Sequence, residues 1–143
     1  MKKFPPIEKI YEAWTALADK RVHLHDGYAD VSSSNGEKAY VVRFSGDQYS
    51  SDDNATFWRG YPGYPVIAVL MLQGKLPYKA EEAEQWKNIN WTSINKKYRN
   101  NYADAVAEIA KDRNIDMAVS SVEAEKVMES LKDLPIEIKR KIK

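Results

Sequence analysis

The chain has 143 residues, a formal charge of +1 from 22 basic and 21 acidic side chains, and no cysteine. This length is typical of one domain and allows a core without metal or disulfide support, so we expect a single domain over residues 1–143. The balanced charge gives no global attraction to nucleic acid or anionic membranes, and the lack of cysteine excludes disulfide scaffolds, thiolate catalysis and Cys-ligated metal sites.

The sequence predicts neither a secretory leader nor a membrane span. Residues 1–8 carry charge but are not followed by an apolar h-region. The most hydrophobic run, 66–72, is far shorter than the roughly 20 residues that a spanning helix needs. We therefore expect a cytoplasmic protein without membrane contact.

The first predicted element is an amphipathic helix that follows Pro5-Pro6. Between Ile7 and Ala18, apolar residues recur at the i, i+3, i+4, i+7 spacing of one helix face. Charged side chains, among them Lys9 and Glu12, occupy the opposite face. We expect the apolar face to enter the core.

A β-hairpin follows, with Asn35-Gly36 as its turn. This dipeptide is the strongest signal for a type I′ turn, which needs positive φ at both central residues. A two-residue turn fixes the register and gives both strands an apolar face at once. The register pairs Val31 with Tyr40, Ala29 with Val42 and Gly27 with Phe44.

The residues before this hairpin do not fit strict alternation. A continuous strand would place His23 and His25 on the buried face, and Val22 and Leu24 on the polar face. A bulge at Asp26-Gly27 would reverse this and return the apolar pair to the core. We favour the bulge, because glycine is common at such positions.

The middle of the chain predicts a loop and then a buried helix. Residues 45–56 are polar and turn-rich. The run 65–73 begins with Pro65 and ends at Gly74, which favours a helix over a central strand. From 79 to 114 neither proline nor glycine interrupts the chain, and two apolar stripes predict two helices with a break near 88–90.

The C-terminal part predicts a last helix. The alternation of Ile115, Met117 and Val119 allows a third short strand. Residues 120–123 form a capping box that opens a helix, and Pro135 closes it. One N-terminal helix, a β-hairpin and three to four C-terminal helices indicate an α+β fold.

Motifs for catalysis are missing. There is no dinucleotide-binding or P-loop glycine pattern, no nucleophile elbow and no zinc-protease motif, so we assign no catalytic residue and expect no cofactor. His23 and His25 would share a strand face and, with Asp26 nearby, could hold a divalent ion for a small metal-dependent hydrolase. The alternative is that both histidines face solvent. We interpret Asp52-Asp53 as solvated turn residues.

The segment 57–65 is the strongest candidate for a binding site. Trp58, Tyr61 and Tyr64 could stack on a ligand or partner, and Arg59 could add a cation–π or phosphate contact. The alternative is that these rings fold back and close the core.

A second candidate combines cations with aromatic residues. Lys96, Lys97 and Arg99 alternate with aromatic residues as on a nucleic-acid-binding face, although this pattern is equally that of an amphipathic helix. A short basic end also occurs, formed by Lys139, Arg140, Lys141 and Lys143.

Three functions are therefore open. The favoured hypothesis is a non-enzymatic protein-interaction or homo-oligomerising module that uses the aromatic segment, because interfaces are enriched in Trp, Tyr and Arg. The first alternative is a module that binds RNA or single-stranded nucleic acid through Trp58, Arg59, Tyr61 and the lysine cluster. The second is the hydrolase that would use the two histidines.

Overall fold

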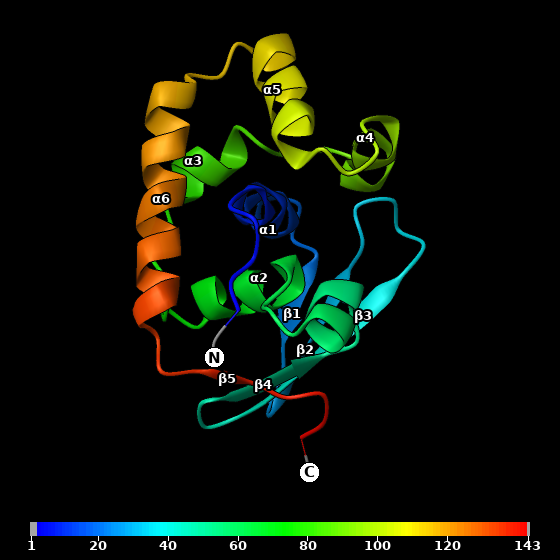
Figure 1. Cartoon of the computed structure of the whole chain (residues 1–143), viewed down its shortest axis with the longest axis vertical. Coiled ribbons are helices and arrows are strands. Elements are labelled where there is room, and N and C mark those ends of the chain that lie inside the picture. Colours follow the sequence, from blue (N-terminus) through cyan, green and yellow to red (C-terminus); the bar gives the residue numbers. More distant parts are fainter. Residues whose placement is uncertain (1–2, 143) are drawn as a thin grey trace.

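Helices cover one face of a β-sheet in the computed structural model, which describes residues 3–142 (Figure 1). The strands are β1 Val22–Leu24, β2 Tyr28–Ser32, β3 Ala39–Ser45, β4 Gln48–Ser51 and β5 Glu137–Ile138. The helices are α1 Glu8–Ala18, the single π-helical turn η1 Ala55–Arg59, α2 Tyr64–Leu72, α3 Ala80–Glu84, α4 Trp91–Lys97, α5 Tyr102–Arg113 and α6 Met117–Asp133. This arrangement confirms the predicted α+β class, with an N-terminal helix and a C-terminal set of helices. Lys143, named above in the basic end, lies outside the described residues.

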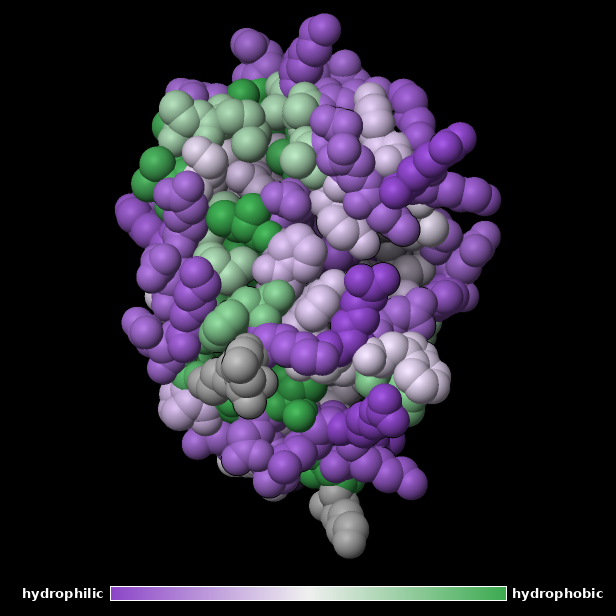
Figure 2. Space-filling model, in the orientation of Figure 1, coloured by the Kyte–Doolittle hydropathy of each residue, from purple (hydrophilic) through white to green (hydrophobic). Residues whose placement is uncertain are grey.

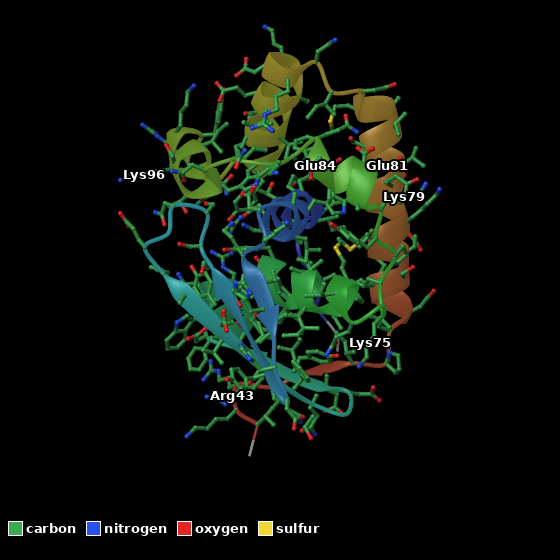
Figure 3. All side chains as sticks on the ribbon, turned by 180° about the vertical axis from the view of Figure 1, so that it is seen from behind. Arg43, Lys75, Lys79, Glu81, Glu84 and Lys96 are labelled. Atoms are coloured by element: carbon green, nitrogen blue, oxygen red, sulfur yellow. The ribbon has the colours of Figure 1, made fainter. Side chains whose placement is uncertain are left out.

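The sheet follows the chain order. Within residues 3–142 it has five strands in the order β1-β2-β3-β4-β5. Neighbours are antiparallel except β4 and β5, which are parallel. The helices lie on one side, and the view from behind shows the opposite face of the strands without a covering helix (Figure 3).

The β2–β3 hairpin confirms the predicted register but not the predicted turn. Val31 pairs with Tyr40 and Ala29 with Val42. Gly36 has φ +75°, but Asn35 does not have the positive φ that a type I′ turn needs. Its side chain instead accepts hydrogen bonds from the Ser33 hydroxyl and the Glu37 amide, at 2.8 and 3.0 Å, and so stabilises a longer loop.

The bulge predicted at Asp26-Gly27 is wrong, because these residues turn the chain back into a second hairpin. The His25 amide donates to the Tyr28 carbonyl at 2.8 Å, and β1 pairs with β2 instead of extending it. Val22 is 9% exposed, whereas Leu24 near the turn remains 41% exposed. The return of Leu24 to the core is therefore also wrong.

Helices α1 and α2 form the centre of the core (Figure 1). Ile10 and Trp14 on α1 are at most 1% exposed, and every residue from 66 to 70 on α2 is fully buried. Burial on all sides explains why α2 is apolar all round. Pro65 lies in its first turn, so the predicted helix is confirmed.

The segment 79–114 has one break more than predicted. Helices α3 and α4 are separated around 85–90, as expected. A second break follows at 98–101, where Arg99 and Asn100 have left-handed φ of 53° and 64°. Asparagine tolerates this conformation better than most residues. Residues 98–101 contain no glycine or proline, so the sequence did not mark this turn.

Helix α6 begins earlier than the predicted capping box. Asp116 is its N-cap and accepts a hydrogen bond from the Ala118 amide at 3.0 Å, so residues 117–119 belong to the helix and the third strand predicted at 115–119 is wrong. Ser120 lies inside α6, fully buried, and donates a hydrogen bond to the Glu82 carboxylate. The helix ends before Pro135, as predicted.

Strands β4 and β5 were not predicted. Residues 45–56 contain β4, which pairs with β3, and the C-terminal β5 pairs beside β4. This long-range pairing brings the end of the chain next to η1, a proximity that no local pattern indicates. Among residues 3–142, the structure contains no helix of the length and apolarity required to span a membrane.

Candidate functional site

The structure divides the aromatic segment 57–65 between two environments. Trp58 is 66% exposed and Arg59 is exposed, whereas Pro62 and Gly63 are buried. Tyr61 is half-buried and interacts electrostatically with Lys9. Tyr64 is half-buried on the other side of the segment, where its ring meets Tyr40 edge-on at 6.3 Å.

A buried aspartate holds this segment in place. Asp53 is 5% exposed, and its carboxylate accepts hydrogen bonds from the Ser51 hydroxyl at 2.5 Å and from the amide and hydroxyl of Thr56, both at 3.1 Å. The Thr56 hydroxyl in turn accepts from the Gly63 amide at 2.9 Å. A Cβ at Gly63 would lie 2.2 Å from Asp53 Oδ2, so only glycine fits. The interpretation of Asp53 as a solvated turn residue is therefore wrong.

The exposed half of the segment forms a cationic and aromatic surface. The Phe57 and Trp58 rings meet edge-on at 4.7 Å, and the Arg140 guanidinium lies 5.4 Å from the centre of each ring. A groove of about 380 Å³ runs beside Phe57 and Arg140 and includes Arg43 and Lys141 in its walls. We call the following residues the Trp58 surface: Phe57, Trp58, Arg59, Arg140, Arg43 and Lys141.

The inner half of the segment borders a polar pocket of about 180 Å³. The pocket lies between α1, the β2–β3 loop, the start of α2 and α4. The Ser34 hydroxyl accepts a hydrogen bond from the Thr92 amide at 3.1 Å, which ties the hairpin loop to α4. The walls of the pocket include Lys9, Glu12, Arg21, Tyr40, Tyr64, Trp91 and Asn95.

One side of the pocket is built on an ion pair. Lys9 Nζ lies 2.9 Å from Glu12 Oε2 and 4.0 Å from the centre of the Tyr102 ring. Glu12 is 5% exposed, so its predicted solvent-facing position is wrong. Burial alone would lower the pKa of Lys9, but the charge and hydrogen bond of Glu12 outweigh it and raise the pKa above its ordinary value. Asn95 Nδ2 donates to the same carboxylate oxygen at 3.4 Å.

The other side contains a guanidinium with unused hydrogen-bonding capacity. Arg21 Nη1 donates to the Ser32 carbonyl, and Nε lies 3.6 Å from Asp19 Oδ2, beyond hydrogen-bond distance. Arg21 Nε and Nη2 and Asn95 Oδ1 are buried and make no hydrogen bond within residues 3–142. Burial raises the pKa of Tyr64 well above its ordinary value, against the opposing charge of Arg21, and so keeps the phenol protonated.

The sequence contains no local signal for this pocket. Glu12 follows the polar periodicity of α1, and Arg21 and Asn95 belong to unremarkable polar stretches. Their meeting depends on the packing of α4 against the hairpin loop. Only Tyr64 was among the predicted binding residues.

The histidines lie at the exposed β1–β2 hairpin. His25 Nε2 is 2.7 Å from Asp30 Oδ2, and its ring stacks on Tyr28 at 4.6 Å. His23 pairs with Asp30 across the two strands, and Asp26 is exposed in the turn. In the described part of the chain, no three His, Asp or Glu side chains are gathered in a way that could hold a metal ion.

The lysine cluster does not adjoin the Trp58 surface. Lys97 Nζ lies 2.6 Å from Glu108 Oε1, and the Tyr98 hydroxyl donates a hydrogen bond to the same oxygen. Both hydrogen bonds lower the pKa of Glu108. Lys96 is exposed on α4, far from Arg43, which lies at the lower part of the sheet (Figure 3). Arg99 is exposed in the turn after α4. Lys96, Lys97 and Arg99 are thus not brought together with Trp58 and Arg59.

Comparison with known proteins gives a family without an assigned activity. Residues 2–137 match the model of a family described as "Uncharacterised conserved protein UCP014422", and the chain belongs to this family. Neither the curated proteins nor the solved structures gave a match.

Proposed function

We propose that the protein is a non-enzymatic interaction module that binds an acidic, partly apolar segment of another protein through the Trp58 surface. The observation that carries this proposal is the exposure of Trp58. It is 66% exposed, more than any other large hydrophobic side chain in the described residues, whereas Trp14, Trp86 and Trp91 are at most 3% exposed. As part of the proposal, the protein acts in the cytoplasm, where a chain without cysteine is unaffected by reducing conditions.

An exposed tryptophan beside arginines supports binding to a protein. Trp, Tyr and Arg dominate the residues that contribute most to protein interfaces, because they bury large areas and retain polar contacts. Arg140 already lies against the Phe57 and Trp58 rings, so little side-chain freedom is lost when a partner covers them.

The charge of the surface supports an acidic partner. Its four cations are Arg43, Arg59, Arg140 and Lys141. The groove wall also includes Asp52, whose carboxylate accepts a hydrogen bond from the Val41 amide at 2.9 Å. Carboxylates of a partner would therefore meet guanidinium groups, which favour bidentate pairing.

A second exposed apolar area offers a control. Val119 and Val122 near the start of α6 are 51% and 48% exposed, and Figure 2 shows apolar side chains at this end of the helix. A small pair of exposed aliphatic residues at a surface is common and needs no partner. The variant Val122→Ala is therefore expected to leave binding unchanged.

The proposal is tested with a random 15-residue peptide library displayed on phage. Selection on the wild-type protein should enrich Asp and Glu around Leu, Phe or Trp. Trp58→Ala should weaken the selected peptides at least tenfold, about 1.4 kcal/mol, and Arg140→Gln several-fold. Peptides that bind Trp58→Ala and wild type equally would contradict the proposal.

Self-association is checked by sedimentation equilibrium. A dimer of the wild-type protein that Trp58→Ala converts to a monomer would overturn the proposal of an acidic partner, because a second copy of the chain would then cover the surface. A monomer at all concentrations is the expected result.

A further inference from the structure

We propose that the polar pocket binds a small zwitterion, a molecule that carries a carboxylate and an ammonium group a few bonds apart, such as a small free α-amino acid. The carboxylate would lie at Arg21, and the ammonium would lie between Glu12 and Asn95. This inference does not depend on the Trp58 surface.

The pocket contains buried polar atoms of both kinds that make no hydrogen bond to the described residues. Arg21 Nη2 and Nε offer N–H donors, and Asn95 Oδ1 offers an acceptor, yet none makes a hydrogen bond within residues 3–142. Asn95 is 8% exposed, so open solvent does not satisfy it. Buried polar groups are nearly always hydrogen-bonded, and a group without a partner destabilises the folded state. A ligand with an acceptor at one end and a donor at the other would satisfy both.

The charges of the pocket are balanced, which favours a ligand without net charge. Lys9 pairs with Glu12 at 2.9 Å, and Asp19 lies 3.6 Å from Arg21 Nε. The Asp53 carboxylate is already occupied by Ser51 and Thr56. A simple anion would add an uncompensated charge, whereas a zwitterion brings one charge of each sign to the matching side.

The carboxylate end has the better-defined site. The Nε and Nη2 groups of an arginine form one edge of the guanidinium, the edge that pairs side-on with a carboxylate. The Tyr64 hydroxyl lies beside Arg21, and the raised pKa keeps it protonated and able to donate a further hydrogen bond.

The size of the pocket limits the rest of the ligand. Its volume of about 180 Å³ lies below the roughly 300 Å³ at which sites for drug-sized ligands begin. Tyr40, Tyr64 and Trp91 contribute aromatic walls. This space suits a small amino acid such as glycine, alanine or serine and excludes nucleotides.

The test uses glycine, alanine and serine as probes, with binding followed by thermal unfolding and by nuclear magnetic resonance shifts. At least one of these amino acids should raise Tm and saturate. Its N-acetyl and carboxamide derivatives, each of which removes one charge, should bind at least tenfold more weakly. This comparison uses the wild-type protein, so it remains decisive even if a variant fails to fold.

Variants locate the site. Glu12→Gln and Arg21→Lys should each weaken the binding amino acid at least tenfold. The first removes the negative charge beside the ammonium, and the second keeps the positive charge but removes the Nε and Nη2 edge that pairs with the carboxylate. Lys132→Gln, which removes an exposed cation on α6 outside both sites, should leave the affinity unchanged. The absence of saturable binding by all three amino acids up to about 10 mM would overturn the proposal, since this concentration exceeds even weak specific affinities.

Two other results would also overturn it. Equal binding of acetate and the amino acid would show that the pocket holds a simple anion. Equal binding of the N-acetyl and carboxamide derivatives and the free amino acid would show that the pocket recognises neither charge. Loss of peptide binding in Trp58→Ala concerns the other surface, so the failures of the two proposals are distinguishable.

Discussion

The Trp58 surface and the polar pocket use the same residue types in opposite environments. Each has an arginine beside aromatic rings, and both border the segment 57–65. Arg140 is exposed and lies over the exposed Trp58 ring and the half-buried Phe57 ring, where water solvates its charge. Arg21 is largely buried and keeps two N–H groups without a hydrogen bond to residues 3–142. An exposed cation adds little to stability and is free to contact a partner, whereas a buried cation requires a matched environment.

The largest expected difference between the two regions concerns their tryptophans. Trp91 is 3% exposed, and its indole N–H donates to the Thr15 hydroxyl at 2.8 Å. Trp91→Ala should lower the free energy of unfolding by about 3–5 kcal/mol, because it leaves a cavity and removes the hydrogen bond that the Thr15 hydroxyl accepts. Trp58→Ala should change it by less than about 0.5 kcal/mol. Urea unfolding of both variants measures this; a loss above about 2 kcal/mol for Trp58→Ala would contradict its description as a surface residue.

The second prediction concerns the connection between the two regions, at Gly63. A Cβ there would lie 2.2 Å from Asp53 Oδ2 and 3.2 Å from Ala55 Cβ, so Gly63→Ala should destabilise the protein by about 3 kcal/mol through overpacking. Gly36→Ala is the matched control. It meets no atom within 4 Å, and with φ +75° it should cost only about 1–2 kcal/mol of backbone strain. Equal unfolding energies for the two variants would show that the Asp53 contact adjusts at little cost.

Comparison of the two regions also shows what the sequence could and could not predict. The α1 face, the β2–β3 register and the helix after Pro65 follow from local periodicity, and the structure confirms them. Asp26-Gly27 is itself a hairpin dipeptide, so the β1–β2 turn could have been predicted from the rule applied to Asn35-Gly36.

The sites themselves depend on contacts distant in sequence. Arg140 reaches Trp58 because β5 pairs beside β4, and Glu12 meets Asn95 across 83 positions. Amphipathic periodicity assigns Glu12 to solvent, since it cannot show that α4 covers that side of α1. Local patterns therefore marked Trp58 as a candidate but could not decide between an exposed and a buried ring, and they gave no signal for the pocket beside Tyr64.

The third prediction separates the regions by alkaline titration. The native state holds the Tyr64 proton to a higher pH than the unfolded state does, since burial raises the pKa of Tyr64 above its ordinary value of 10.0. This contribution is complete below pH 10 and is lost as the pH rises beyond it, by up to about 1.4 kcal/mol per pH unit. Burial also raises the pKa of Tyr11 to about 12, so Tyr64→Phe should reduce this loss without abolishing it.

Urea unfolding between pH 9 and 11 measures the slope. Tyr28→Phe, at an exposed position, is the control, and an unchanged slope in Tyr64→Phe would contradict the burial of this phenol.

The smallest expected effect is on the Trp58 surface, where Arg140 partly covers the indole. A cation–π contact at an exposed site contributes about 0.5–1 kcal/mol, so Arg140→Ala should barely change the unfolding energy. It should instead make Trp58 more accessible to acrylamide, which quenches exposed indoles. Trp58→Phe removes the readily quenched fluorescence and identifies the signal, because Trp14, Trp86 and Trp91 are at most 3% exposed. The matched control is Lys132→Ala, which removes an exposed cation from α6, away from Trp58. If Arg140→Ala and Lys132→Ala leave the quenching constant equally unchanged, then Arg140 does not rest on Trp58 in solution, and a partner would have to order both side chains when it binds.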